Sequence, residues 1–372
     1  MFSLALSRQK SVLLGAAALA VAAYVLLPLV LPVFWVQLVV FAAAAAIAAI
    51  GLQFLIGTSG QLSLAHSFFM AVGAYSYAVL GKVPGGGSSG WQVGLPSLLA
   101  AVAAVVIAGL VGLLFSFVSA RLGGLYLGLA SLGLVMIGAH VLTVAHSLTG
   151  GVYGRDVPVL TVGGFGFSDT DPELWFGTHQ LLGIGRLWYL TLAVLLISYW
   201  LLRNVAHGRA GRAMNALRDS ESAAAAAGVR VQHYKALAYV ISSCYAGLGG
   251  VLTALAFQHI VPTYFSLTLS LNFLAMVVIG GMRSITGAVV GAFVVTGLPL
   301  VLSNYAGSLP FLGAPGSGGL EPGVFAQFIF GAVVIVVLIL QWADLRGLRR
   351  GLRVLLPART SSTDAPLASI NR

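Results

Sequence analysis

The chain has 372 residues, of which 59% are hydrophobic and only 8% are charged. Soluble domains carry about 25% charged residues, so this composition excludes a soluble protein and predicts an all-α integral membrane protein. The net charge of +10 does not indicate nucleic-acid binding, because the basic residues lie between and after the apolar runs. The single cysteine, Cys244, excludes an intramolecular disulfide and a metal site built from several cysteines.

Apolar runs predict about ten transmembrane helices. A basic start precedes the first run, as in a signal peptide, but this run is longer than a usual signal core and we expect it to be retained. Residues 1–343 are then a transmembrane domain, and residues 344–372 are a basic, partly disordered tail. The expected spans are residues 11–31, 33–56, 64–80, 96–120, 122–144, 187–202, 236–257, 266–279, 285–305 and 324–342.

The distribution of basic residues predicts the orientation. With ten spans and a cytoplasmic N-terminus, the C-terminus is also cytoplasmic, and only Lys82, Arg155 and Arg186 of the 19 Lys and Arg residues lie outside. This asymmetry is the one expected of a protein whose positive loops stay in the cytoplasm. Residues 146–185, which are rich in acids, then form an external loop, and residues 203–235 form a cytoplasmic loop.

Polar residues interrupt the chain before the third span, in the sequence GTSGQLSLAHSFF (residues 57–69). Broken helices are tolerated inside membranes where they are buried in protein or line a cavity. The alternative is a tight cytoplasmic turn followed by a packing face of small residues. The candidates for lining such a cavity are Gly57, Ser59, Gly60, Gln61, Ser63 and His66, with Gly280 and Gly281 at the end of the short eighth span.

The longest basic segment between two spans, residues 203–235, contains helix signals of its own. Ser220 can cap a short helix over the alanine-rich residues 223–227, and Gly228 supplies a stop. Upstream, residues 212–218 are expected to form a second short helix. We expect a firm knob here, and the alternative is an ordinary basic loop that only fixes topology.

The expected spans contain few residues that could bind ions, hold a metal or catalyse a reaction. No Asp or Glu lies within an expected span, which argues against an ion-driven carrier, although sodium coupling through backbone carbonyls stays open. The histidines are scattered without metal-site spacing, so we expect no metal and no catalytic residue. The chain has no GxxxxGK[ST] phosphate loop, and we expect it to bind no cofactor.

Four stretches, in this order along the chain, carry a family resemblance. They are similar to the permease subunit of branched-chain amino-acid ABC importers, the type usually paired with a second, similar permease. The stretches are GTSGQLSLAHSFFMAVGAYSYA (57–78), RLGGLYLGLASLGL (121–134) followed by LTGG (148–151), GRAMNALRDSESAAAAAGVRVQHYKALAYVIS (211–242) and SLNFLAMVVIGGMRSITGAVVGA (270–292).

The resemblance implies an ABC importer permease fold in the bacterial cytoplasmic membrane. It implies translocation of branched-chain or related amino acids delivered by an external solute-binding protein. Urea, amides or sugars are alternative substrates, and an ion-coupled secondary transporter is an alternative mechanism. The implied partners are cytoplasmic ATPase subunits that use the ATP, a second homologous permease, the binding protein and membrane lipid, with no nucleic acid.

The resemblance also assigns roles to segments. The loop 203–235 would dock into a cleft of the ATPase. Apart from the resemblance, we expect the stretch 57–66 to lie near the substrate path, because its polar atoms and glycine backbone would find no partners in lipid. The loop 146–185 would receive the binding protein, unless it is a solvated loop with no partner. Ser222 departs from the plain acid–Ala–Ala pattern of other importers. The candidate coupling residues are Arg212, Arg218, Glu221, Ala223, Ala224 and Gly228.

Overall fold

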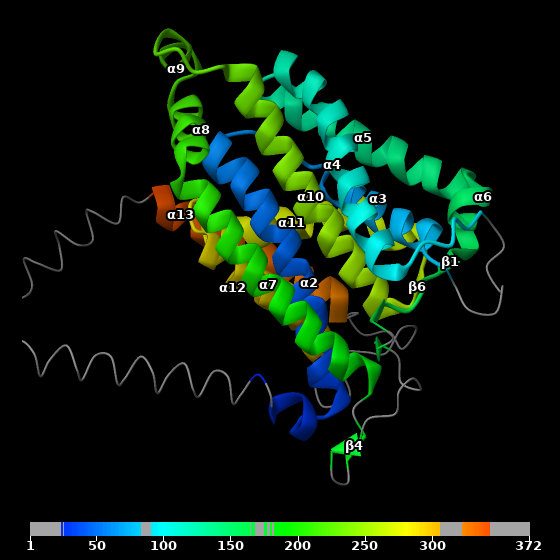
Figure 1. The fold of residues 1–372 in the computed structure, drawn as a ribbon. Coiled ribbons are helices and arrows are strands. Elements are labelled where there is room, and N and C mark those ends of the chain that lie inside the picture. The colour runs from blue at the N-terminus through cyan, green and yellow to red at the C-terminus, as the bar shows by residue number, and fades with distance from the viewer. Residues whose placement is uncertain are drawn as a thin grey trace, which may run out of the picture.

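The computed structural model describes residues 24, 26–82, 91–163, 165–167, 175–176, 179–180, 182–305 and 322–342. Most of the expected first span, the basic tail and part of the loop 146–185 lie outside these residues. Long helices run between two ends of the molecule (Figure 1). They are α2 (Val33–Gln53), α3 (His66–Leu80), α4 (Ser97–Arg121), α5 (Gly124–Val144), α7 (Gly183–His207), α10 (Val231–Phe257), α11 (Leu267–Gly280), α12 (Ile285–Asn304) and α13 (Pro322–Trp342).

The helices α2 and α10 lie at the centre of the bundle. Helix α10 packs against α2, α3 and α4, and α2 also packs against α7 and α12. Small residues allow these backbones to approach closely. A Cβ atom added at Gly73 would lie 2.3 Å from the carbonyl oxygen of Gly247, and one added at Gly250 would lie 2.0 Å from that of Met70. The closest approaches between these helices are therefore made at glycine positions.

The helical prediction is confirmed for the described residues, and the expected runs match observed helices to within a few residues. The sixth and seventh runs extend further than expected, as α7 and α10. Within the described residues, six helices are long and apolar enough to cross a membrane: α2 with its π-helical extension, α4, α5, α7, α10 and α12. Helix α11 and the Val324–Val336 part of α13 are shorter apolar helices.

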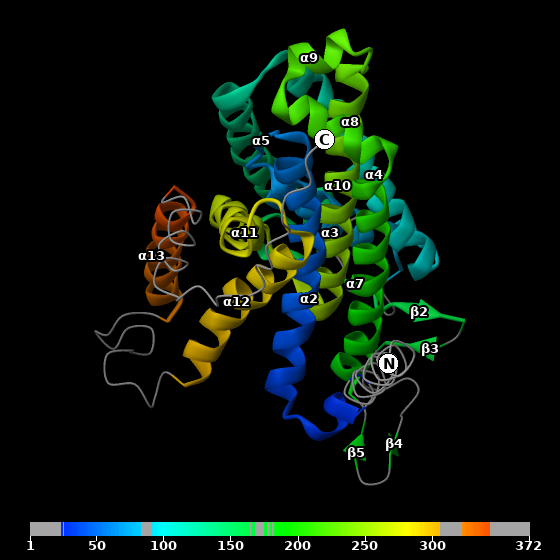
Figure 2. The ribbon, with the colours of Figure 1, turned by 90° about the vertical axis from the view of Figure 1, so that its left-hand side faces the viewer.

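The two ends of the bundle differ. One end carries the short helices α8 (Arg209–Asp219) and α9 (Glu221–Ala226), and the other carries short strand pairs (Figures 1 and 2). These are β2 (Thr161–Val162) with β3 (Phe165–Gly166), β4 (Trp175–Phe176) with β5 (His179–Gln180), and β1 (Arg155–Asp156) with β6 (His259–Ile260). We call these the helical end and the strand end.

At the strand end, the pairing of β1 with β6 ties the loop after α5 to the loop after α10. Arg155 is only 3% exposed, and its guanidinium donates to the carbonyl oxygens of Ala78, Leu148 and Trp91. A buried guanidinium needs several acceptors to offset its desolvation. These three carbonyls supply them and hold three separate segments together.

Candidate functional site

The helices α8 and α9 form a rigid knob at the helical end, as the sequence predicts. Helix α8 is fixed to the bundle through Met214, which is fully buried in a cluster with Phe54 and Leu202. Helix α9 stands further out, and of its residues only Ala224 is buried. The knob therefore presents a small-residue surface to its surroundings while its base is packed on the spans.

Both ends of α9 are capped. The hydroxyl of Ser220 accepts from the backbone N–H of Ala223 at 3.3 Å, which confirms the predicted N-cap. At the other end Gly228 has a φ of +82°, and its N–H bonds to the carbonyl of Ala225. The N–H of Val229 bonds to the carbonyl of Ala224, which completes a Schellman motif. Gly228 thus ends the helix as predicted, through a left-handed backbone that favours glycine.

Two polar links join the knob to the interior of the bundle. The ammonium of Lys235, on α10, lies 2.7 and 2.8 Å from the two carboxylate oxygens of Glu221. The guanidinium of Arg218 bonds to Asp219 and to the backbone carbonyl of Gly57, at the end of α2. Arg218 therefore points into the protein, and Glu221 is held by a salt bridge between α9 and α10.

Arg212 lies elsewhere on the knob, where it donates to the carbonyl oxygen of His207 at 3.0 Å and stays exposed. The six candidate coupling residues therefore differ in their surroundings, and Ala224, on α9, is buried. Arg218 faces the bundle, while the exposed Glu221, Ala223 and Gly228 lie on or beside α9. Their coupling to a partner stays a prediction.

The polar interruption is a buried, non-helical segment between the π-helical turn η1 (Phe54–Thr58) and α3. Side chains supply part of its hydrogen bonding. Gln61 donates to the hydroxyl of Ser59 at 3.0 Å and accepts from the hydroxyl of Ser119, on α4, at 2.5 Å. The N–H of Leu64 donates to the hydroxyl of Ser131, on α5, at 2.8 Å. The segment is thus fastened to two neighbouring helices.

The start of α3 continues this polar network. His66 is 1% exposed, and its Nε2 lies 2.7 Å from the carbonyl oxygen of Ala48, in the middle of α2. The hydroxyl of Ser270, on α11, accepts from the N–H of Ser67 at 3.1 Å. Ser63 is also buried, at 2% exposure. These polar groups are bonded within the bundle, as in the packing alternative, and their place beside a substrate path stays a prediction.

The four candidate glycines lie at close contacts or turns. A Cβ atom at Gly57 would lie 1.9 Å from the carbonyl oxygen of Met282, and one at Gly280 would lie 2.0 Å from that of Gly287. Gly60 and Gly281 have φ angles of +72° and +94°. The structure therefore brings Gly57 next to the turn between α11 and α12, where Gly280 and Gly281 lie.

An apolar cavity of about 360 Å³ lies between α2, α10, α11 and α12. Aromatic rings form much of its wall, and Phe257 stacks on Tyr264 with ring centroids 4.7 Å apart. A few polar side chains, including Asn272 and Thr296, interrupt this wall. Ligand sites have this composition and size. The sequence analysis did not select these residues, because each lies in an apolar run that resembles any other span.

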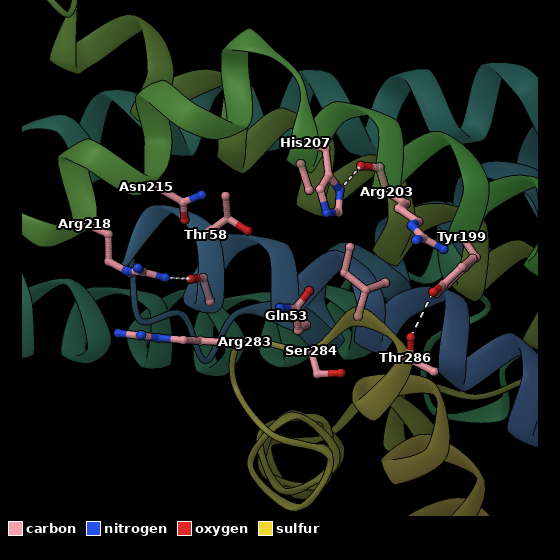
Figure 3. A pocket seen from close by; sticks show the side chains of 13 residues that line it. Gln53, Thr58, Tyr199, Arg203, His207, Asn215, Arg218, Arg283, Ser284 and Thr286 are labelled. Atoms are coloured by element: carbon pink, nitrogen blue, oxygen red, sulfur yellow. Dashed lines mark hydrogen bonds between the residues drawn. The ribbon is translucent and has the colours of Figure 1, made fainter. Parts of the chain in front are cut away.

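A second cavity, of about 680 Å³, lies at the helical end between α2, α7, α8 and the start of α12 (Figure 3). Its described lining is cationic and polar, with Arg203, Arg218 and Arg283 among its residues. Gln53 lies in its wall and donates to the carbonyl oxygen of Met282 at 3.1 Å.

The strand end carries an exposed charged pair. His259 Nδ1 lies 2.7 Å from a carboxylate oxygen of Asp156, across the β1–β6 pair. The hydrogen bond to Asp156 raises the pKa of His259 above its usual value. A metal site has no support in the described residues, where no three His, Cys, Asp or Glu side chains gather as ligands.

Comparison with known proteins gives one consistent family. The family model described as branched-chain amino acid transport system / permease component matches residues 34–338. The high-affinity branched-chain amino acid transport system permease protein LivM of Escherichia coli is 33% identical over 247 residues, which cover 63% of this chain and 56% of the relative. LivM of Salmonella typhimurium is 32% identical with the same coverage.

A second group of relatives is named for a different import system. The autoinducer 2 import system permease protein LsrC of Klebsiella pneumoniae is 30% identical over 237 residues, which cover 61% of this chain and 63% of the relative. The chain spans little more than half the length of the LivM relatives of Escherichia coli and Salmonella typhimurium. No solved structure matches the chain.

Proposed function

Because this chain belongs to the family of branched-chain amino acid transport permeases, we propose that it is the membrane-embedded permease subunit of an ATP-driven importer. Its substrates are branched-chain or related amino acids, delivered from outside by a solute-binding protein. A separate ATPase hydrolyses the ATP, and a second, homologous permease completes the membrane core. The aromatic, apolar wall of the 360 Å³ cavity favours a branched aliphatic side chain over a sugar, whose hydroxyls need many polar partners.

The observation that carries this proposal is the double link between the knob and the interior. A cleft in the ATPase would receive the exposed surface of α9. Movement of α9 would pull on Lys235 through Glu221, and the backbone carbonyl of Lys235 accepts from Gln61 at 3.4 Å. Gln61 in turn bonds to Ser119, on α4. The motion of the ATPase would thereby reach the buried segment through hydrogen bonds and packed side chains.

A urea or sugar importer is the second candidate. The similarity to LsrC, a relative named for autoinducer 2 import, favours it. An ion-coupled secondary transporter is less well supported, because a knob held by two polar links has no role in a carrier that works without an ATPase.

Reconstitution in liposomes tests the function. We expect this chain alone to show no ATP-dependent uptake, because it has no phosphate-binding loop. With its second permease, ATPase and binding protein, it is expected to take up radiolabelled leucine at least tenfold faster than ribose or urea. Uptake by the chain alone would contradict the importer proposal, and preference for ribose or urea would contradict the proposed substrate.

The proposed topology has ten spans in the bacterial cytoplasmic membrane, with both termini and the helical end in the cytoplasm. Single cysteines in a Cys244→Ala background test it. Tyr153, which is 88% exposed at the strand end, is expected to label as cysteine in intact cells, and Ser222, on α9, only after permeabilisation. Labelling of Ser222→Cys but not Tyr153→Cys in intact cells would show that the orientation is the reverse of the proposed one. Labelling of both would contradict the span count.

A further inference from the structure

The cationic cavity at the helical end has no role in the transport scheme above. It lies between α2, α7, α8 and the start of α12, and Figure 3 shows Arg203 and His207 near one side of it and Arg218 and Arg283 near the other. Among the described residues that line it, none is acidic. The cavity therefore concentrates positive charge at one place on the protein.

Two of its arginines have no counter-charge of their own. Arg218 is satisfied, since it bonds to Asp219 and to the carbonyl of Gly57. Neither Arg203 nor Arg283 makes an ion pair or side-chain hydrogen bond within the described part of the chain, and both are exposed. An anion in the cavity would be attracted by both, and it could bond to either guanidinium without displacing an existing partner.

The position of the cavity selects the kind of anion. On α7, Leu196 and Trp200 are 65% and 62% exposed. Residues that are three or four positions apart share one face of a helix, so Leu196 and Trp200 lie in line with Arg203. Arg203 is about one turn nearer the cavity than Trp200. Exposed tryptophan at such a place marks the boundary between hydrocarbon and headgroups. An apolar strip thus leads directly to a cationic cavity, an arrangement that suits a molecule with acyl chains and a phosphate.

A buried acceptor adds a third contact. Gln53 is 2% exposed, and its amide oxygen has no hydrogen-bond partner among the described residues. An unsatisfied buried polar atom is costly, and a donor from a bound molecule would remove this cost. The hydroxyl groups of a glycerol headgroup are donors of this kind.

We propose that this cavity binds the headgroup of an anionic phospholipid. Its phosphate lies in the cavity within the combined positive field of Arg203 and Arg283, a headgroup hydroxyl donates to Gln53, and an acyl chain follows Leu196 and Trp200 along α7. Basic pockets between transmembrane helices are a known way to bind anionic headgroups. The bound lipid would fill the space between the base of the knob and the turn from α11 to α12.

Native mass spectrometry of the full chain, released from nanodiscs that contain phosphatidylglycerol and phosphatidylcholine, tests the proposal. Each arginine near a membrane surface contributes about fivefold to the binding of an anionic lipid. The double variant Arg203→Gln/Arg283→Gln is therefore expected to bind phosphatidylglycerol roughly 25-fold more weakly. Arg203→Lys/Arg283→Lys, which keeps both charges, is expected to recover most of this loss.

The matched control is Arg209→Gln/Arg230→Gln, which changes the net charge equally at two exposed arginines outside the cavity. It is expected to change binding by less than about twofold. An equal loss in the control would mean unspecific attraction and would overturn the proposal, as would full retention in the cavity variant. Displacement of the lipid by millimolar inorganic phosphate would overturn the proposal and assign the cavity to a soluble anion. A spectrum in which the chain carries a co-purified protein and no lipid would overturn it in favour of an acidic protein partner.

Discussion

Replacing Gly228 by valine is expected to reduce ATP-driven uptake, by up to about 30-fold, while leaving expression and membrane insertion near normal. Gly228 has a φ of +82°, and a Cβ atom there would meet nothing within 4 Å. The cost of a side chain is therefore backbone strain alone, about 1–2 kcal/mol in the left-handed region. This strain falls on the Schellman motif that ends α9, and it lowers the equilibrium constant for the ordered knob about 5- to 30-fold, which sets the upper limit for the loss of uptake.

The measurement is co-purification of the ATPase with the variant, together with ATP hydrolysis and leucine uptake in liposomes. Gly228→Asn is the matched control, because asparagine tolerates the left-handed backbone and the open space around Gly228 admits its side chain. It is expected to keep most of the uptake. Normal coupling in Gly228→Val would leave the loop 203–235 as a topological anchor, which is the alternative raised by its composition.

Filling the apolar cavity is expected to lower leucine uptake at least tenfold. Thr296, on α12, is half-buried in its wall, and Thr296→Trp would place an indole in a space of about 360 Å³. A ligand that must enter this space would lose its contacts or its access. Capture of the ATPase is expected to stay unchanged, because no residue of α8 or α9 lines this cavity.

Val294→Trp provides the control for this experiment. Val294 lies two residues away on the same helix, is 46% exposed and does not line the cavity. Its indole would face outward, so uptake is expected to stay within about twofold. Equal uptake by the two tryptophan variants would exclude the cavity from the substrate path and would return attention to the buried segment 59–66.

The helices and the knob could be predicted from the sequence because both depend on local signals. Apolar runs between polar breaks locate the spans, and the cap at Ser220 and the stop at Gly228 are set by residues within one or two turns of the helix that they bound. The bounds of α7 were predicted less well, since its polar ends, including Arg203 and His207, continue as helix beyond the apolar run. A charged residue ends an apolar run, but it does not end the helix that contains this run.

The arrangement of the sites could not be predicted in this way. Glu221 meets Lys235, which lies 14 positions further along the chain, and Gln61 meets Ser119 from another helix. The apolar cavity draws residues from α2, α10, α11 and α12, whose hydrophobic composition looks alike along the sequence. The sequence identified Gln61 and His66 as unusual, but only the packing shows that they are bonded to Ser119 on α4 and to Ala48 on α2.

The pairing of β1 with β6 has a consequence for biosynthesis. Arg155 and Ile260 are partners across this ladder, so the earlier strand is made about a hundred residues before the later one. In the meantime α7 and α10 must be inserted into the bilayer, and the knob between them must be made. Contacts between distant parts of a chain form late, because the intervening loop must first be closed. The β1–β6 pair at the strand end can therefore form only after α10 has been inserted. In a nascent chain that stalls before that point, Asp156 would lack its partner His259.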